Sequence, residues 1–144
     1  MIFQVGHLYR FEPFYFENGT SKDKFFLVIA SAGDDVIMAS LPTSKDHIPN
    51  IKPQNAGAYE YTDIGLNVYK FDANTKVTNK HTFERDTFIY GSGLNLYNTE
   101  LLNSHKSNII DLGKMYNHYF DAIINNLKKS KVIKKKYSKI LNQE

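Results

Sequence analysis

The residues of this sequence best suited to chemistry stand at the two outer ends of one strand–turn–strand segment. Two apolar runs, FFLVIA and VIMAS, flank the glycine-containing turn at 32–35. Antiparallel pairing places the start of the first run beside the end of the second. An ammonium, two hydroxyls and an imidazole are therefore expected to meet there, as either a solvated sheet end or a site. These groups belong to Lys24, Thr43, Ser44 and His47.

Among these groups, the imidazole of His47 is the one suited to acid–base chemistry. An imidazole titrates near neutral pH and is the commonest proton donor or acceptor in catalysis. His47 follows Thr43 by four residues and is the only histidine near the paired strand ends. The other histidines show no metal-ligand spacing, so we predict neither a metal site nor a cofactor. They are His7, His81, His105 and His118.

Short strands and one late helix are expected to position this hairpin. The hairpin covers about 24–31 and 35–41, and Pro42 ends its second arm because proline cannot continue a ladder. A helical stripe of apolar residues recurs at three- and four-residue steps over 115–127. Further strand candidates are 5–11, AYEYT, LNVYKF and TFIYG, with a helical turn at 98–103. This order predicts a mainly β fold: a small, bent antiparallel barrel capped by a C-terminal helix.

Composition narrows the class of protein. The chain has 144 residues and no cysteine, which excludes disulfides and thiolate zinc sites. No apolar run approaches the roughly 18 residues of a membrane span, and the first residues lack a signal-peptide pattern. We therefore expect a protein of the cytoplasm without a membrane partner.

Positive charge is concentrated at the C-terminus. Seven of the 18 basic residues lie between Lys128 and the end, with Glu144 as the only acid, whereas the rest of the chain holds 11 basic and 14 acidic residues. Such a segment is either a solvated helix end or a surface for an anionic partner. We divide the chain into a barrel with its closing helix, 1–130, and a lysine-rich helical tail, 131–144.

The order of these motifs resembles the PemK/MazF-like toxins of bacterial toxin–antitoxin systems. A glycine opens the first strand in Val5-Gly6-His7-Leu8-Tyr9, and an Asn18-Gly19 turn follows. A basic residue then heads Lys24-FFLVI, and the next strand ends in VIMASLPTS. A late Asp111-Leu112-Gly113-Lys114-Met115 precedes the striped helix. The resemblance spans about 3–127.

This resemblance implies an SH3-like barrel, a homodimer and metal-independent cleavage of single-stranded RNA. In that reaction a 2′-hydroxyl attacks its own phosphate, so DNA is not a substrate. Carried over by position, Lys24 would be the basic residue and Thr43, with Ser44 beside it, the hydroxyl. The family has arginine where this chain has Lys24, and lysine offers a point charge without a bidentate fork. His47 could supply the proton transfer that Lys24 does not.

RNA contacts are expected from lysines and aromatic rings near the hairpin and in the tail. Aromatic rings at the end of the first strand either stack on unpaired bases or cover the end of the barrel. The candidates are Lys22, Lys45, Phe14, Tyr15, Lys134, Lys135 and Lys136.

Two other functions compete with this expectation. One is a non-catalytic SH3-like module that binds RNA or protein. The other is the gyrase poisoning of CcdB-like toxins, which share the fold but depend on a C-terminal tryptophan, and this chain has none. For the ribonuclease, the implied partners are single-stranded RNA and a cognate antitoxin, either protein or RNA.

Overall fold

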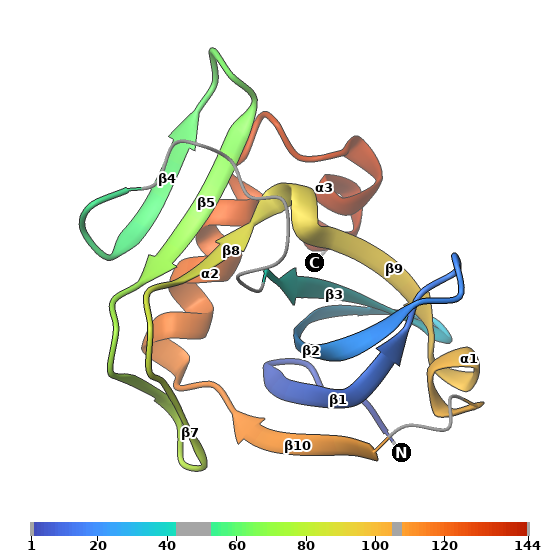
Figure 1. Ribbon diagram of the computed structural model, residues 1–144. Helices are drawn as coiled ribbons and strands as arrows, with labels where there is room; N and C mark the ends of the chain where they lie inside the picture. Colours follow the sequence, from blue (N-terminus) through green and yellow to red (C-terminus); the bar gives the residue numbers. More distant parts are fainter. Residues whose placement is uncertain (1, 43–52, 105–107, 144) are drawn as a thin grey trace.

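The computed structural model describes residues 2–42, 53–104 and 108–143. Figure 1 shows a structure built mainly of β-strands, which confirms the mainly β part of the predicted fold class. The strands are β1 (His7–Tyr15), β2 (Ser21–Ala32), β3 (Asp35–Leu41), β4 (Gly57–Tyr61), β5 (Leu66–Phe71), β6 (Thr75–Thr78), β7 (His81–Phe83), β8 (Thr87–Tyr90), β9 (Leu94–Asn98) and β10 (Asn108–Lys114). The helices are α1 (Thr99–Ser104), α2 (Asn117–Lys128) and α3 (Lys135–Leu141), and η1 (Gly91–Gly93) is a single 3-10 turn.

The predicted hairpin forms the middle of a five-stranded antiparallel sheet, in the order β10-β1-β2-β3-β9. Gly33 closes the turn between β2 and β3 with a φ of 63°, a conformation that glycine adopts without steric cost. At the other end of the hairpin, Phe25 pairs with Leu41. The predicted meeting of the two outer ends therefore holds as far as the described residues extend.

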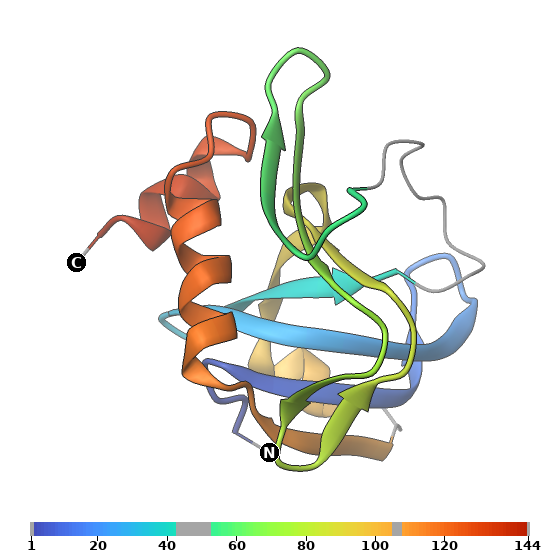
Figure 2. The same ribbon diagram turned by 90° about the vertical axis from the view of Figure 1, so that its left-hand side faces the viewer.

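The remaining strands form two smaller antiparallel sheets, β4-β5-β8 and β6-β7. In the described part of the chain, the three sheets are separate and do not close into one barrel. Figure 2 shows α2 standing along one side of the sheets, with α3 beside it. The helices cover the side that the sheets leave open.

The main core lies between the five-stranded sheet, β5 and the two C-terminal helices. Leu27 of β2 and Phe71 of β5 pack in one cluster with Ile123 of α2. The predicted stripe is confirmed, because Ile123 and Leu127 are buried. Within the predicted lysine-rich tail, α3 forms as a separate helix, and Tyr137 on it is buried in the same cluster.

A second, mostly aromatic cluster covers the opposite face of the five-stranded sheet. The rings of Phe11 and Phe26 lie 5.3 Å apart in an edge-to-face arrangement, and Phe14 packs against both. Leu102 of α1 closes this cluster. The sheet therefore has both faces covered, one by helices and one by its own aromatic rings.

Four strands are absent from the sequence prediction: β6, β7, β9 and β10. The β6–β7 hairpin turns through Asn79 and Lys80, with Thr78 paired to His81, so no glycine marks it. The strands β9 and β10 mix polar and apolar residues and form the two edges of the large sheet, paired with β3 and β1. Without a strict alternation of two, such a segment carries no clear strand signal.

Candidate functional site

Lys24, the predicted basic residue, is a buried lysine near the start of β2. Only 6% of it is exposed. Burial, with a smaller contribution from the nearby Lys22, lowers the pKa of Lys24 to about 8. The predicted site residues Thr43, Ser44 and His47 lie outside the described residues, and so does Lys45 of the predicted RNA contacts.

Lys24 and its neighbour Phe25 point to opposite faces of the sheet, because successive strand residues alternate. Lys24 pairs with Phe11 and so shares the face of the aromatic cluster. Phe25 lies on the other face, where it borders the main core and pairs with Arg10 of β1. The two faces of this strand end therefore carry different cations, a buried lysine and a half-exposed arginine.

Arg10 brings to this strand end the guanidinium that position 24 lacks. Its guanidinium carbon lies 5.4 Å from the centre of the Phe25 ring, a cation–π contact. Its Nε lies 3.0 Å from Glu12 Oε1, and its Nη2 donates to Asp23 Oδ2 at 3.2 Å. The Arg10 side chain is 39% exposed. These contacts fix its direction and leave part of the fork open to solvent.

His81 of β7 lies on the same phenylalanine. The centres of the His81 and Phe25 rings are 5.2 Å apart, and Phe83 contacts His81 edge-on at 5.4 Å. Burial lowers the pKa of His81, and the positive charge of Arg10 lowers it further, against the opposing effect of Glu84. The imidazole is therefore held mainly neutral at pH 7, in the form that accepts a proton.

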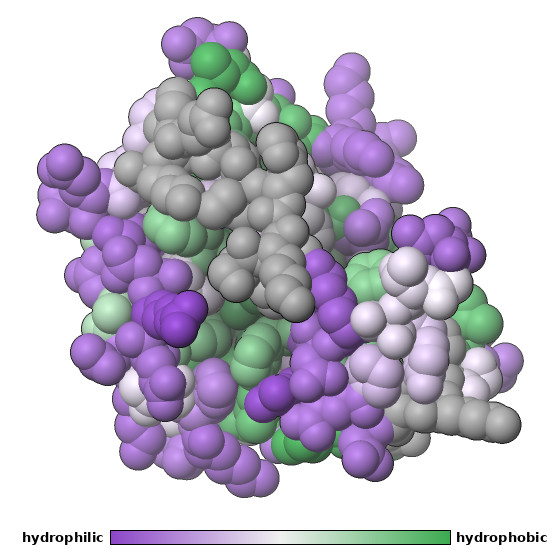
Figure 3. Space-filling view, in the orientation of Figure 1, coloured by the Kyte–Doolittle hydropathy of each residue, from purple (hydrophilic) through white to green (hydrophobic). Residues whose placement is uncertain are grey.

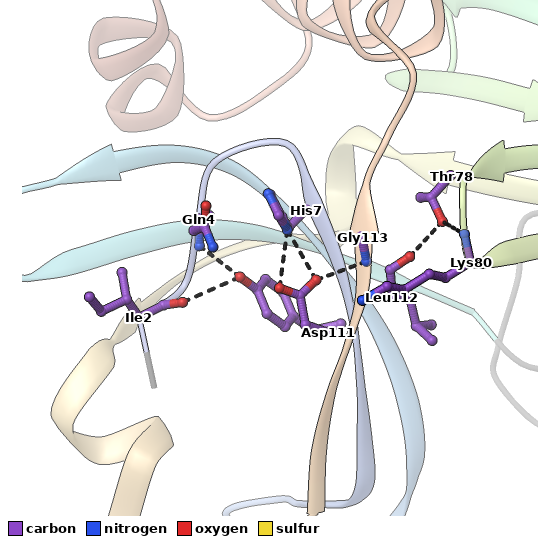
Figure 4. Close-up of polar contacts among 9 residues, drawn as sticks. Ile2, Gln4, His7, Thr78, Lys80, Asp111, Leu112 and Gly113 are labelled. Atoms are coloured by element: carbon purple, nitrogen blue, oxygen red, sulfur yellow. Dashed lines mark hydrogen bonds and ion pairs between the residues drawn. The ribbon is translucent and has the colours of Figure 1, made fainter.

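The β6–β7 hairpin that carries His81 is fastened to β10. Thr78 is fully buried, and its hydroxyl donates to the carbonyl oxygen of Leu112 at 2.5 Å. The same hydroxyl oxygen accepts the backbone N–H of Lys80 at 3.0 Å, which sets the turn (Figure 4). Tyr116 N–H donates to Val77 O at 2.9 Å. One buried threonine thus joins the turn before His81 to the edge of the large sheet.

A histidine–aspartate pair fastens β10 to β1 in turn. Nδ1 of His7 lies 3.0 Å from Oδ1 and 3.2 Å from Oδ2 of Asp111 (Figure 4). Asp111 also accepts the backbone N–H of Gly113 at 2.8 Å. Burial alone would raise the pKa of Asp111, but these hydrogen bonds and the charges of His7 and Lys80 lower it overall. The first and last motifs of the sequence resemblance therefore meet at this pair.

The two faces of this strand end support different chemistry. On the face of Arg10 and His81, a guanidinium that can pair with a phosphate stands near a neutral imidazole that can take a proton. Hydrophobic side chains lie in a recess between hydrophilic ones on the face drawn in Figure 3. In the described ranges, no group of three or more histidine, aspartate or glutamate side chains is arranged to hold a metal ion.

The predicted RNA contacts fall into three groups. Phe14 is packed in the aromatic cluster and covers one face of the large sheet, while Tyr15 is 43% exposed. The ammonium of Lys22 lies 5.8 Å from the centre of the Phe16 ring. The three tail lysines are exposed at the start of α3, far from the β6–β7 hairpin (Figures 1 and 2). They are Lys134, Lys135 and Lys136.

Sequence reasoning missed both members of the Arg10–His81 pair. Arg10 could have been found from the register of the first two strands, which sets it across from Phe25. His81 gave no such signal, because the hairpin that carries it has no glycine at its turn.

Comparison of the chain with protein-family models, with curated proteins and with solved structures finds no match. Over the residues that the structure describes, none of the helices is long and apolar enough to cross a membrane.

Proposed function

We propose that this protein is an endoribonuclease that cleaves single-stranded RNA by metal-independent attack of a 2′-hydroxyl. The observation that carries the proposal is the placement of Arg10 and His81 on one ring, that of Phe25. The sequence resemblance to PemK/MazF-like toxins supports the same reaction. Within this proposal the three sheets are a variant of the SH3-like barrel of that family.

The reaction needs a base, a cation and an acid. His81 takes the proton of the 2′-hydroxyl, whose oxygen then attacks the adjacent phosphorus. Arg10 pairs with the phosphate oxygens, on which negative charge grows. The bond from phosphorus to the 5′ oxygen breaks, which leaves a 2′,3′-cyclic phosphate and a 5′-hydroxyl.

The leaving 5′ oxygen must receive a proton. We retain Lys24 and His47 as the candidate acids, and Thr43 and Ser44 as hydroxyl donors to the phosphate. Lys24 fits this role by its pKa of about 8, which allows it to give up a proton near neutral pH. Lys24 is buried on the face of β2 opposite Arg10 and His81, so of the two candidate acids it is the less direct donor to a phosphate held by that pair.

The partners of the toxin-like activity follow from the same resemblance. We propose that the protein acts in the cytoplasm as a homodimer and that a cognate antitoxin, protein or RNA, keeps it inactive. An antitoxin that covers the Arg10 side chain would block access to the phosphate. Because such an antitoxin inhibits by binding the protein and not the RNA, it should not protect the RNA from an unrelated ribonuclease.

The proposal is tested with purified protein in EDTA, incubated with a long single-stranded RNA, its DNA equivalent, and an RNA carrying one 2′-deoxy nucleotide at a mapped cleavage position. We expect cleavage of the RNA alone, with a cyclic phosphate product, and loss of cleavage at the substituted position. Arg10→Gln should cleave at least about 100-fold more slowly. The matched control is Arg85→Gln, which removes an exposed arginine outside the Arg10–His81 pair. Cleavage of the DNA, or of the RNA at the 2′-deoxy position, would contradict the proposal, and retained RNA binding without cleavage would favour the non-catalytic module.

A further inference from the structure

A group of exposed lysines surrounds the connection between α2 and α3. These residues, called here the lysine face, are Lys129, Lys131, Lys134, Lys135, Lys136 and Lys139. Lys135 and Lys139 are four residues apart on α3 and therefore lie on one side of the helix. The buried residues of that helix, Tyr137 and Leu141, occupy its other side.

The lysine face is held in place by the core and by one carboxylate. Tyr137 and Leu141 are 2% and 5% exposed and belong to the main core cluster. Glu60 of β4 accepts hydrogen bonds from the hydroxyl of Ser130 and from the backbone N–H of Lys131. The helix connection is thus tied to the β4-β5-β8 sheet. The lysines extend from a fixed platform, which lowers the entropic cost of binding a partner.

Most of the positive charge of the lysine face has no acidic partner within the described chain. None of its six ammonium groups lies in an ion pair with a described carboxylate. Glu60 binds Ser130, the Lys131 backbone and the amide of Asn67, and its carboxylate also attracts the charge of Lys131, so the other five lysines have no such partner. A cluster of like charges without counter-ions attracts a polyanion.

The lysine face also lacks the features of a protein interface. Stable protein interfaces have an apolar, aromatic-rich centre from which lysine is depleted. No large hydrophobic side chain of the segment 129–139 is exposed, and every exposed residue in that segment is one of the six lysines. A segment whose exposed residues are all lysines fits a phosphate backbone better than an acidic protein.

We propose that the lysine face binds the phosphate backbone of single-stranded RNA, as a second contact separate from the Arg10–His81 pair. The choice of RNA rests on the proposed function, whereas the choice of a phosphate backbone rests on the lysine face alone. In both views α3 and β7 lie at opposite ends of the molecule (Figures 1 and 2). Only a strand long enough to span both sites would contact the two together.

Salt dependence of binding tests this inference, because each phosphate contact releases condensed counter-ions. For single strands the slope of log K against log salt changes by about 0.7 per contact. Binding is measured by fluorescence anisotropy with a 30-nucleotide DNA, which has no 2′-hydroxyl and survives the assay whatever the enzyme does to RNA. The Lys135→Gln/Lys139→Gln variant should reduce the slope by about 1.4 and bind at least 5-fold more weakly at 0.1 M salt. The same oligonucleotide as RNA should respond alike.

A second double variant, Lys76→Gln/Lys80→Gln, removes two exposed lysines from the β6–β7 hairpin beside the Arg10–His81 pair and reports contacts at that site separately. Thermal melting verifies that both double variants fold. A wild-type slope for Lys135→Gln/Lys139→Gln would overturn the inference. The Lys135→Gln/Lys139→Gln variant is also tested with polyglutamate. If this variant binds polyglutamate more weakly than the wild type but binds the oligonucleotide with unchanged affinity, the inference is overturned in favour of an acidic protein partner. Absence of RNA cleavage by the wild type would refute the proposed function alone.

Discussion

His81 and Arg10 lie against one phenylalanine ring, although 70 residues separate them in the chain. Arg10 reaches the ring of Phe25 from the adjacent strand, and His81 reaches it from a hairpin outside the large sheet. Aromatic contact with a phenylalanine orients both groups without using their polar atoms. The ring itself therefore uses no hydrogen-bonding position of either group, although Glu12 and Asp23 already lie at Nε and Nη2 of Arg10.

The pH dependence of cleavage should show that Arg10 acts on His81. Because burial and Arg10 lower the pKa of His81, its neutral form should persist below pH 6.5, the usual value for histidine. The pH at which kcat/KM declines on the acidic side of its profile should therefore lie below 6.5. In Arg10→Gln the limb should move to higher pH, since the neighbouring positive charge is gone, whereas Arg85→Gln should leave it in place. An unchanged limb in Arg10→Gln would show that Arg10 does not influence the base.

Removing Asp23 should strengthen RNA binding. Its carboxylate occupies Nη2 of Arg10 and repels an approaching phosphate. The pair is exposed, and such ion pairs contribute about 0.2–1 kcal/mol. We therefore expect Asp23→Asn to lower the Kd for RNA by about two- to fivefold at low salt. The control is Asp63→Asn, because Asp63 is an exposed aspartate in the β4–β5 turn. Equal Kd values for the two variants would count against the role of Asp23.

Lys24 should make stability depend on pH in the alkaline range. Its folded pKa of about 8 lies below the value of about 10.4 for an unfolded lysine. Between these values the unfolded state binds more protons, so the contribution of Lys24 to the free energy of unfolding rises with pH. Between pH 7.5 and 9.5 the wild type should gain roughly 2 kcal/mol relative to Lys24→Met.

Urea unfolding at several pH values measures this difference. Lys76→Met replaces an exposed lysine and should track the wild type throughout the range. A constant difference between Lys24→Met and the wild type would mean that Lys24 keeps an ordinary pKa.

Asp111 should make stability depend on pH in the acidic range, with the opposite sign. Its pKa is lowered in the folded state, so the stabilisation is present above the unfolded value of about 3.9 and is lost as pH falls below it. At pH 7, Asp111→Asn should reduce the free energy of unfolding by about 1 kcal/mol, because the charge-assisted bond to His7 weakens. Denaturant unfolding should show this deficit shrinking below pH 4, whereas Asp121→Asn, on the surface of α2, should show none.

The hairpin and the striped helix were predictable from the sequence for physical reasons. Both faces of β2 are buried, so its residues form an unbroken apolar run, and Gly33 supplies the positive φ that its turn requires. In α2 the apolar stripe follows the helical period, with Ile123 and Leu127 facing the core. In such elements, local pattern and tertiary packing agree.

The candidate site was less predictable because its members come from unrelated segments. Arg10 looks like an ordinary strand residue until the β1–β2 register sets it beside Phe25. His81 depends on Thr78, whose buried hydrogen bond to Leu112 is a long-range contact without a sequence signature. Lys24 was expected to meet polar groups, but its pairing with Phe11 places it on the aromatic face. The alternation of residues along a strand assigns them to two faces of the sheet, but it does not show which face is exposed to solvent.

The most direct test of the account is the rate of RNA cleavage by His81→Gln in EDTA, measured against wild type and His118→Gln. Glutamine keeps hydrogen-bonding capacity but cannot take a proton in this range, and His118 is an exposed histidine on α2. The account predicts a loss of at least about 100-fold in kcat for His81→Gln, with RNA binding retained, and a wild-type rate for His118→Gln. Cleavage by His81→Gln at the wild-type rate would contradict it.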